Sequence, residues 1–392
     1  MKKLQLVFIV WVLMSLNAFS QKQDTAQVKK AFVPSGKLWG YVFGDYMYKT
    51  NTNSFNMSNT QYGATTTSGT SSFATPKNYN SFEFRRIYLG YDYDISEHFS
   101  SQVLLAYEGG NFSSDGSRSV FIKAANLRWK NIFKNTDLVM GQQTTSTFAT
   151  VAEPIWAYRS LEKTIMDMRK IGKSNDVGVS LQGKFNDKGD FGYNLMIGNG
   201  TAQTQETNKF KKIYADVWAK LMNQKIIIDF GGDNETAQQS PYNMTKTTIK
   251  GFAAYQTKDF TLGIEAFKQI QGNNTIYTQQ TVKDTVNAIA QGISIFSNGK
   301  ITNKLRFVLR YDNYNPDAKF NSNNVYSASY NASSVFKETF ILAALDFAPM
   351  KNVHIMPNIW YDKYDNRNTA VNKLNSGSYD LAARLTVYYV FK

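Results

Sequence analysis

The sequence predicts an all-β protein: a membrane-spanning, antiparallel β-barrel of about sixteen strands, with short turns at one end and long loops at the other. Three observations lead to this fold class. The last segment of the chain alternates apolar and polar residues, the first segment has the pattern of a signal peptide, and the connectors along the chain are short and long in turn. Together they indicate a secreted chain whose strands have one apolar and one polar face.

The final segment, residues 378–391, has a strict period of two. Its odd positions are apolar and its even positions carry polar groups such as Asp380, Arg384 and Thr386. A period of two predicts a strand with two unlike faces. A water-soluble barrel strand shows the same alternation, but a segment of about ten residues that ends in an aromatic residue, here Phe391, is typical of an outer-membrane strand. As the last strand, it is expected to close the barrel against residues 38–48.

The N-terminal residues 1–20 resemble a secretory signal peptide. Lys2 and Lys3 precede an apolar run over 4–16, and Ala18-Phe19-Ser20 is a small-x-small cleavage site. The run is shorter than the roughly 20 residues of a spanning helix, although a retained membrane anchor is the alternative. We expect 21–36 to be a periplasmic lead-in and 37–392 to be the barrel. Cleavage lowers the formal net charge from +14 to +12.

Composition narrows the functional classes. The chain has no cysteine, which excludes a lipidated cysteine, a disulfide framework and a thiolate metal site. No other apolar run approaches the roughly 18 residues of a transmembrane helix. Abundant Tyr and Phe with little Pro suit many strands with aromatic girdles. The basic excess indicates an acidic membrane surface or anionic solutes, because secretion disfavours nucleic acid as a partner.

Two kinds of connector alternate along the chain. The short ones carry turn residues and lie at 95–98, 130–135, 186–190, 223–224, 257–259, 298–300 and 348–352. The long ones are rich in Asn, Thr, Ser and Gly and lie at 50–80, 108–119, 146–174, 199–212, 233–246, 270–290, 312–337 and 365–377. Seven short and eight long connectors join about sixteen strands and place both chain ends on the periplasmic side.

Alternation also predicts which residues face the lipid. The expected outward residues are Ile87, Leu89, Tyr91, Tyr93, Val177, Val179, Leu181, Ile213, Ala215, Val217, Ala219, Leu221, Leu305, Phe307, Leu309 and Tyr311. The expected inward residues are Arg86, Tyr88, Gly90, Asp92, Asp176, Ser180, Gln182, Lys184, Asp216, Lys220, Lys304, Arg306, Arg310 and Arg384. Residues 225–230 are apolar at most positions on both faces, so their orientation stays open.

Residues 153–170, in the third long connector, break the period of two. Ile155, Tyr158, Leu161, Ile165 and Met168 recur at spacings of three and four, which predicts a helix. An apolar stripe on a loop can pack against the inner wall of a barrel and narrow its channel. The helix would then present Arg159, Lys163, Arg169 and Lys170 to the lumen, with Glu162 and Asp167 opposite. The alternative is an extracellular helix on the barrel rim.

Several short motifs resemble the phosphate-selective porin family. They are Phe82-Glu-Phe-Arg-Arg-Ile-Tyr-Leu-Gly-Tyr, Gly141-Gln142, Ala157-Tyr-Arg-Ser-Leu161, Gly172 and Asp176-Val-Gly-Val-Ser-Leu-Gln-Gly183, in the family's order and spacing over about 81–200. The resemblance implies a sixteen-stranded, often trimeric outer-membrane barrel of the O/P type for passive diffusion of anions. It also implies a third loop folded into the channel and basic lumen residues that attract phosphate, with Arg86 and Arg159 as the matching positions.

Two features depart from the family pattern. The chain ends in Phe391-Lys392 rather than on the aromatic residue itself. Interior acids dilute any basic ladder; they are Asp92, Asp216, Glu265, Asp346 and Asp380.

Few residues suit catalysis or metal binding. The two histidines, His98 and His354, fall at predicted turns, and no Ser lies in a G-x-S-x-G setting. We therefore predict no enzyme activity and no cofactor. Asp362, Asp365, Asn366 and Asn368 offer oxygen ligands for Ca²⁺, but their spacing is not that of a known calcium loop and a solvated loop is the simpler interpretation.

The predicted function is passive diffusion of small hydrophilic solutes through an outer-membrane porin that prefers phosphate-like anions. The expected pore-lining residues are Arg86, Arg128, Arg159, Lys163, Arg169, Lys170, Lys184, Lys220, Lys304, Arg306, Arg310 and Arg384. The expected partners are outer-membrane lipid, the barrel-assembly machinery, small anionic solutes and further copies of the chain in a homotrimer. The rival hypothesis is a barrel without transport, whose long loops bind partners.

Overall fold

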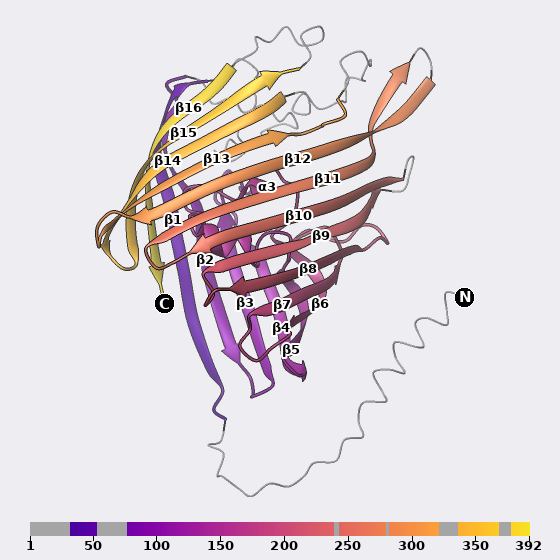
Figure 1. Cartoon of the computed structure of the whole chain (residues 1–392), viewed down its shortest axis with the longest axis vertical. Helices are drawn as coiled ribbons and strands as arrows, with labels where there is room; N and C mark the ends of the chain where they lie inside the picture. The colour runs from indigo at the N-terminus through magenta and orange to yellow at the C-terminus, as the bar shows by residue number, and fades with distance from the viewer. Residues whose placement is uncertain (1–31, 53–76, 239–242, 280–281, 321–335, 368–377) are drawn as a thin grey trace, which may run out of the picture. The chain divides into compact units, whose positions relative to one another are not determined.

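The computed structural model describes residues 32–52, 77–238, 243–279, 282–320, 336–367 and 378–392. Within residues 34–392 it is a closed antiparallel barrel of sixteen strands, as predicted (Figure 1). Each strand pairs with its neighbours in the chain, and the last strand, β16, pairs with β1, matching Val42 with Tyr389. The predicted signal peptide and most of the predicted lead-in lie outside the described residues.

The strands follow the predicted segments. They are β1 Ser35–Asn51, β2 Asn80–Asp94, β3 Phe99–Glu108, β4 Phe121–Phe133, β5 Thr136–Thr144, β6 Asn175–Lys184, β7 Phe191–Gly198, β8 Lys212–Leu221, β9 Ile226–Gln238, β10 Met244–Gln256, β11 Phe260–Gln279, β12 Val282–Lys300, β13 Leu305–Asn315, β14 Phe336–Met350, β15 Val353–Asn366 and β16 Ser378–Phe391. Two short helices, α2 Ala152–Trp156 and α3 Ile165–Met168, lie between β5 and β6.

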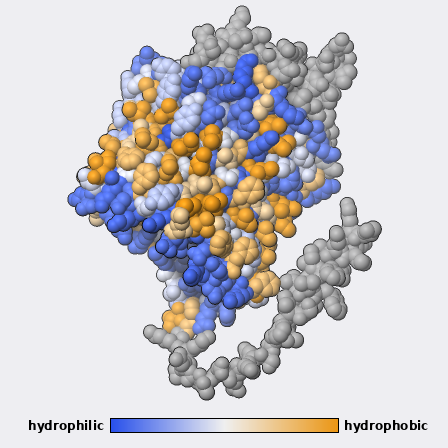
Figure 2. All heavy atoms as spheres, in the orientation of Figure 1, coloured by the Kyte–Doolittle hydropathy of each residue, from blue (hydrophilic) through white to orange (hydrophobic). Residues whose placement is uncertain are grey.

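The outer surface of the barrel is apolar, as the alternation predicts. Leu309, Leu345 and Leu385 are between 43% and 51% exposed, whereas the neighbouring inward residues are buried. Apolar side chains gather over the outward face of the front strands (Figure 2). Backbone polar groups in a bilayer must bond to each other, and a closed barrel satisfies this requirement. Among the described residues, no helix is long and apolar enough to cross a membrane.

The outward face yields a stability prediction. Replacing Leu345, in the apolar band of β14, with arginine is expected to destabilise the barrel by roughly 2–4 kcal/mol, because the charge would meet lipid. Denaturant unfolding in lipid vesicles measures this loss. Leu345→Met is the control with little expected change. An arginine variant as stable as the control would mean that this face does not contact lipid.

The inner wall differs between the two halves of the barrel. On β9 to β16 apolar inward side chains, among them Ile227, Phe252, Phe296 and Trp360, form a core with the third loop and alternate with buried polar and charged groups. Ile227 and Asp229 face inward on β9, while Ile228 and Phe230 face outward. Ile227 is apolar although it faces inward, because it packs in the core with the third loop, residues 145–174.

Two β-bulges place extra basic residues inside the barrel. The β1–β2 register shifts between Phe43 and Gly44, so Arg85 and Arg86 are both buried inward. The β3–β4 register shifts between Leu104 and Leu105, and Lys123 turns inward beside Ala124. A bulge adds one residue to one strand of a pair and re-aims its side chain.

Two predicted connectors and one residue placement differ from the sequence prediction. In the connector expected at 233–246, β9 continues to Gln238 and β10 begins at Met244. Residues 270–290 were expected to form a loop, but β11 and β12 continue as a paired hairpin to Gln279 and Val282. Residues 271–287 are mostly polar in sequence, so hydrophobic periodicity does not mark them as strands. Lys304 was expected inside the barrel but is exposed in the turn before β13.

Candidate solute passage

The third loop lies inside the barrel and is not one helix. Residues 153–170 were expected to be helical, but only α2 and α3 are, and Ala157 ends α2 with a left-handed φ of 60°. Tyr158 O still accepts from backbone N–H groups, but the carbonyl groups of residues 160 to 163 bond to side chains instead of to the next helical turn. Trp156 Nε1 donates to Glu162 O at 2.7 Å, and wall arginines donate to the carbonyls of Ser160 and Leu161. These bonds replace the helix ladder.

Three inward arginines hold this backbone. Arg85 donates to Ser160 O at 2.5 Å and to Leu161 O at 2.9 Å, and Arg384 donates to Leu161 O at 2.7 Å. Arg310 donates to Lys163 O. The barrel seam is the junction where β1 pairs with β16. Because these donors come from β2, β16 and β13, they fix the loop to both sides of this seam. Arg310 and Arg384, which were predicted to line the pore, thus bind the third loop.

Carboxylates orient these arginines. Asp45 lies 3.2 Å from Arg85 Nε and 3.2 Å from Arg384 Nη1, and Asp312 lies 2.5 Å from Arg310 Nη2. The guanidinium of Arg384 also stacks 3.6 Å from the ring centroid of Trp360. A buried arginine with carboxylate and carbonyl partners is held rigidly.

Apolar packing holds the loop from the other side. Leu161, Ile165 and Met166 are fully buried, and Trp156 meets Phe296 edge to face with ring centroids 5.0 Å apart. Each such side chain contributes about 1.5–3 kcal/mol when buried. The loop therefore fills the half of the lumen beside β9 to β16.

Most of the loop's basic residues are paired. Arg159 contacts Glu153 and lies 2.8 Å from Asp167, and Lys163 Nζ lies 3.9 Å from the same carboxylate. Arg169 pairs with the wall carboxylates of Glu338 and Asp362, the latter at 3.5 Å. Lys170 is exposed. The predicted row of lumen-facing loop cations is thus largely neutralised.

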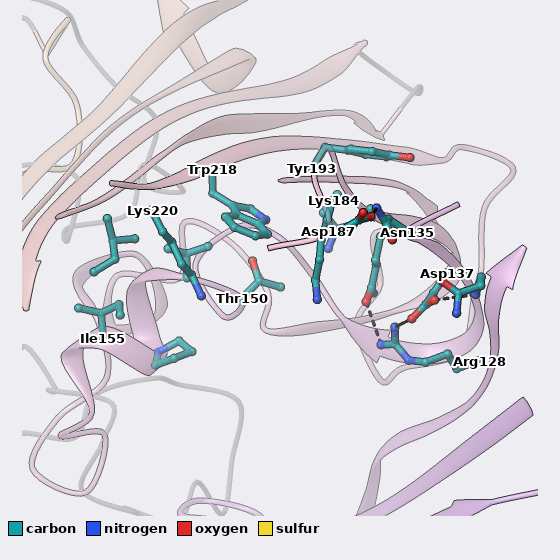
Figure 3. Close-up of a pocket in the computed structure, with 17 residues that line it drawn as sticks. Arg128, Asn135, Asp137, Thr150, Ile155, Lys184, Asp187, Tyr193, Trp218 and Lys220 are labelled. Atoms are coloured by element: carbon teal, nitrogen blue, oxygen red, sulfur yellow. Dashed lines mark hydrogen bonds and ion pairs between the residues drawn. The ribbon is translucent and has the colours of Figure 1, made fainter. Parts of the chain in front are cut away.

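A cavity of about 510 Å³ lies between α2 and the wall formed by β4 to β9 (Figure 3). Thr150 and Ile155 reach it from the third loop, and Trp218 and Lys220 reach it from β8. Its lining also includes Lys184, which brings a second amine to the cavity. This half of the lumen keeps a polar, partly open space.

The unpaired charges of the cavity are positive, because its two carboxylates, Asp137 and Asp187, have hydrogen-bond partners. Arg128 binds Asp137 at 2.8 Å and Gln182 at 2.8 Å. Asp187, in the turn after β6, accepts a hydrogen bond from Asn135, which with Lys134 lowers the pKa of its carboxyl. Lys184 has no ion pair among the described residues, nor does Lys220, whose amine lies 5.4 Å from the Trp218 ring centroid. Two cationic side chains thus remain available to a passing solute.

A second cluster of basic residues surrounds Glu108, the last residue of β3. Lys123 Nζ lies 2.8 Å from this carboxylate, Arg86 Nε lies 3.6 Å away, and the Tyr88 hydroxyl donates to it. Sequence alternation found Arg86 but missed Arg85 and Lys123, because each lies at a bulge. The sequence signal for the first bulge was the pair of adjacent arginines, Arg85 and Arg86, within one strand.

The remaining predicted positions have other contacts. Arg306 donates to Asn298 Oδ1 at 2.8 Å near the short turns. His354 contacts Asp346 at 2.8 Å, and His98 is exposed in a turn. Of the suggested calcium ligands, Asp362 pairs with Arg169 and Asp365 with Lys363 at 3.0 Å. Asn368 lies outside the described residues.

Comparison with solved structures identifies the fold. The outer membrane channel DcaP of Acinetobacter baumannii matches 91% of this chain and 97% of its own, with a TM-score of 0.62 and 15% identity. The anion-selective porin of Comamonas acidovorans matches 92% and 100%, with a TM-score of 0.58 and 10% identity. The trimer form of OmpT of Vibrio cholerae matches 92% and 100%, with a TM-score of 0.55 and 10% identity. The fold is that of the outer-membrane porins.

At these identities the likeness shows the fold alone. No protein-family model matches the chain, and no curated protein matches it either. The closed barrel and its apolar outer surface, in a fold shared with outer-membrane porins, place the chain in the Gram-negative outer membrane, as predicted.

Proposed function

We propose that this chain is an outer-membrane porin for passive diffusion of small hydrophilic solutes, with a preference for anions. The observation that carries the proposal is the cavity beside α2, where Lys184 and Lys220 lack carboxylate partners among the described residues. A fixed positive charge in a narrow, partly apolar passage lowers the electrostatic barrier for anions. The solute moves down its own gradient, and the protein supplies no energy.

A general anion preference fits the contacts better than a dedicated phosphate ladder. Arg310 and Arg384 donate to loop carbonyls, and Arg159 pairs with loop carboxylates. Phosphate recognition needs several donors free to converge on one ion. Phosphate is therefore proposed as one of several anions that pass, not as the sole cargo.

The proposal includes assembly as a homotrimer. A trimer form exists for OmpT of Vibrio cholerae, whose fold this chain shares. Insertion would use the barrel-assembly machinery of the outer membrane. The rival function, partner binding through long loops without transport, predicts that the cavity conducts no ions.

A planar-bilayer recording in a KCl gradient tests the channel and its lysines. Wild-type channels are expected to give a zero-current potential of the sign that marks anion selectivity. The double variant Lys184→Gln with Lys220→Gln is expected to lower the anion-to-cation permeability ratio about fivefold, because a unit charge at 4 Å in water contributes about 1 kcal/mol.

Lys268→Gln is the matched control, because Lys268 is exposed on the outward face of β11 between Ile264 and Ile270. It should leave the ratio unchanged. Absence of any conductance would support the rival function, and a ratio unaffected by the double change would reject the role of the two lysines.

A further inference from the structure

A strip of aromatic rings lines the inner wall at the barrel seam. Tyr41 and Phe43 of β1, Tyr88 of β2, Tyr388 of β16 and His354 of β15 form this seam strip. Neighbouring ring centroids lie close: Tyr41 to Tyr88 at 4.6 Å, His354 to Tyr388 at 5.5 Å, and Phe43 to Tyr388 at 6.0 Å. The rings thus form one continuous surface across four strands.

The seam strip borders open space. A cavity of about 190 Å³ is lined by Tyr41, Phe43 and Tyr388 on the wall side and by Pro154 and Arg159 on the loop side. Pro154 also lines the larger cavity that contains Lys184 and Lys220. The two cavities therefore share Pro154 of α2 as a lining residue, with the rings in one cavity and the amines in the other.

The tyrosine hydroxyls of the strip differ in their partners. The Tyr88 hydroxyl donates to Glu108. Those of Tyr41 and Tyr388 have no hydrogen-bond partner among the described residues, and both side chains are partly exposed to the lumen. Buried tyrosine hydroxyls usually find a partner. These two remain free to bond to a solute or to water.

The combination of groups has a chemical match. The face of an aromatic ring is partially negative because of its quadrupole and attracts C–H groups, and tyrosine hydroxyls exchange hydrogen bonds with alcohols. A pyranose ring offers both a C–H face and a rim of hydroxyls, and a carboxylate on it would meet Lys184 or Lys220. Inorganic phosphate has no apolar face and gains nothing from the rings.

We propose that the preferred solutes of this passage are acidic sugars: pyranose rings that carry a carboxylate. The inference rests on the proposed porin function and names its solute class. The seam strip contacts the ring, and the amines across α2 attract the carboxylate. A neutral sugar meets only the strip, and an open-chain acid meets only the amines.

Current block in planar bilayers tests the solute class on the full-length protein. Trigalacturonate, maltotriose and gluconate are added in turn to channels that conduct KCl. Trigalacturonate, an acidic ring compound, is expected to half-block the current at a concentration at least tenfold below those of maltotriose, a neutral ring compound, and gluconate, an open-chain acid.

Substitutions in the seam strip measure its contribution to the block separately from that of Lys184 and Lys220. Tyr41→Ala and Tyr388→Ala are each expected to raise the half-blocking concentration of trigalacturonate by about threefold to tenfold, whereas Tyr388→Phe keeps the ring and most of the effect. Tyr389→Ala is the matched control, because Tyr389 lies next in sequence but faces outward and is 43% exposed. It should leave the block unchanged.

The outcomes distinguish this inference from the proposed function. Channels that conduct and select anions but are blocked equally by gluconate and trigalacturonate would overturn the solute class and leave the porin function standing. Stronger block by benzoate than by trigalacturonate would also overturn it, in favour of aromatic acids. Absence of KCl conductance would reject both.

Discussion

Replacing Arg384 with methionine is expected to loosen the third loop and to lower the free energy of unfolding by about 3–5 kcal/mol. Arg384 donates to Leu161 O at 2.7 Å and to Asn358 Oδ1 at 2.9 Å, and it pairs with Asp45. The variant leaves the Asp45 carboxylate buried with one fewer cation. Unfolding by denaturant in lipid vesicles measures the loss, and single-channel recording should show a larger, noisier current.

Two controls separate the clamp from a general charge effect. Arg384→Met combined with Asp45→Asn should recover part of the stability, because the buried carboxylate is then also removed. Arg128→Met removes an arginine whose pair with Asp137 is about one-third exposed, and it should cost only about 1 kcal/mol or less. An Arg384 variant that matches Arg128→Met in stability and current would contradict the loop anchor.

Replacing Trp156 with alanine is expected to cost about 3–5 kcal/mol, because it opens a cavity in the apolar core under the loop. Trp156 is 1% exposed, its ring centroid lies 5.0 Å from that of Phe296, and its indole donates to Glu162 O. Hydrogen exchange of the amides in the third loop should accelerate with the loss of stability.

Ile155→Ala is the matched control for this prediction. Ile155 precedes Trp156 in α2 but lines the open cavity and is only partly buried. Its truncation should cost less than half as much. If both variants are equally stable and protected, the loop is not held by the packing of its indole.

The barrel itself could be predicted from the sequence because lipid imposes a simple rule. Each strand needs an apolar face of period two, and connector lengths differ between the two ends. The outward residues of β8, such as Val217, and the inward pair Asp216 and Lys220 follow this rule. The closing pair of β1 and β16 follows from counting the strands.

The inner surface could not be predicted in the same way. The two bulges shift alternation by one residue, and no period marks them, so Arg85 and Lys123 were missed. Arg310 and Arg384 were placed on the correct face, but their partners are loop carbonyls that only the folded chain brings near. The face of a strand on which a residue lies can be predicted from the local sequence pattern. The partners of its side chain across the lumen depend on the path of the third loop.

The conformation of the third loop could be predicted only in part, because it also depends on contacts across the lumen. Its apolar stripe packs on the wall, with Leu161 and Ile165 fully buried, where the sequence left a rim helix as the alternative. Its helix was not correctly expected, because arginine donors from the wall bond to the carbonyls that a continuous helix needs. Local periodicity does not register such competition from distant side chains.

The proposed function requires solutes to pass along the half of the lumen that includes β6 and β8, while the third loop closes the half beside β9 to β16. The chain has no cysteine, so single-cysteine variants give a clean test. Lys220→Cys lies at the cavity, and Ala290→Cys lies under the loop at a position that is 1% exposed.

The decisive measurement is the single-channel current of both variants before and after addition of a negatively charged thiol reagent. We expect the current through Lys220→Cys channels to fall and the current through Ala290→Cys channels to stay the same. Block at Ala290→Cys with no effect at Lys220→Cys would contradict a solute path beside β6 and β8.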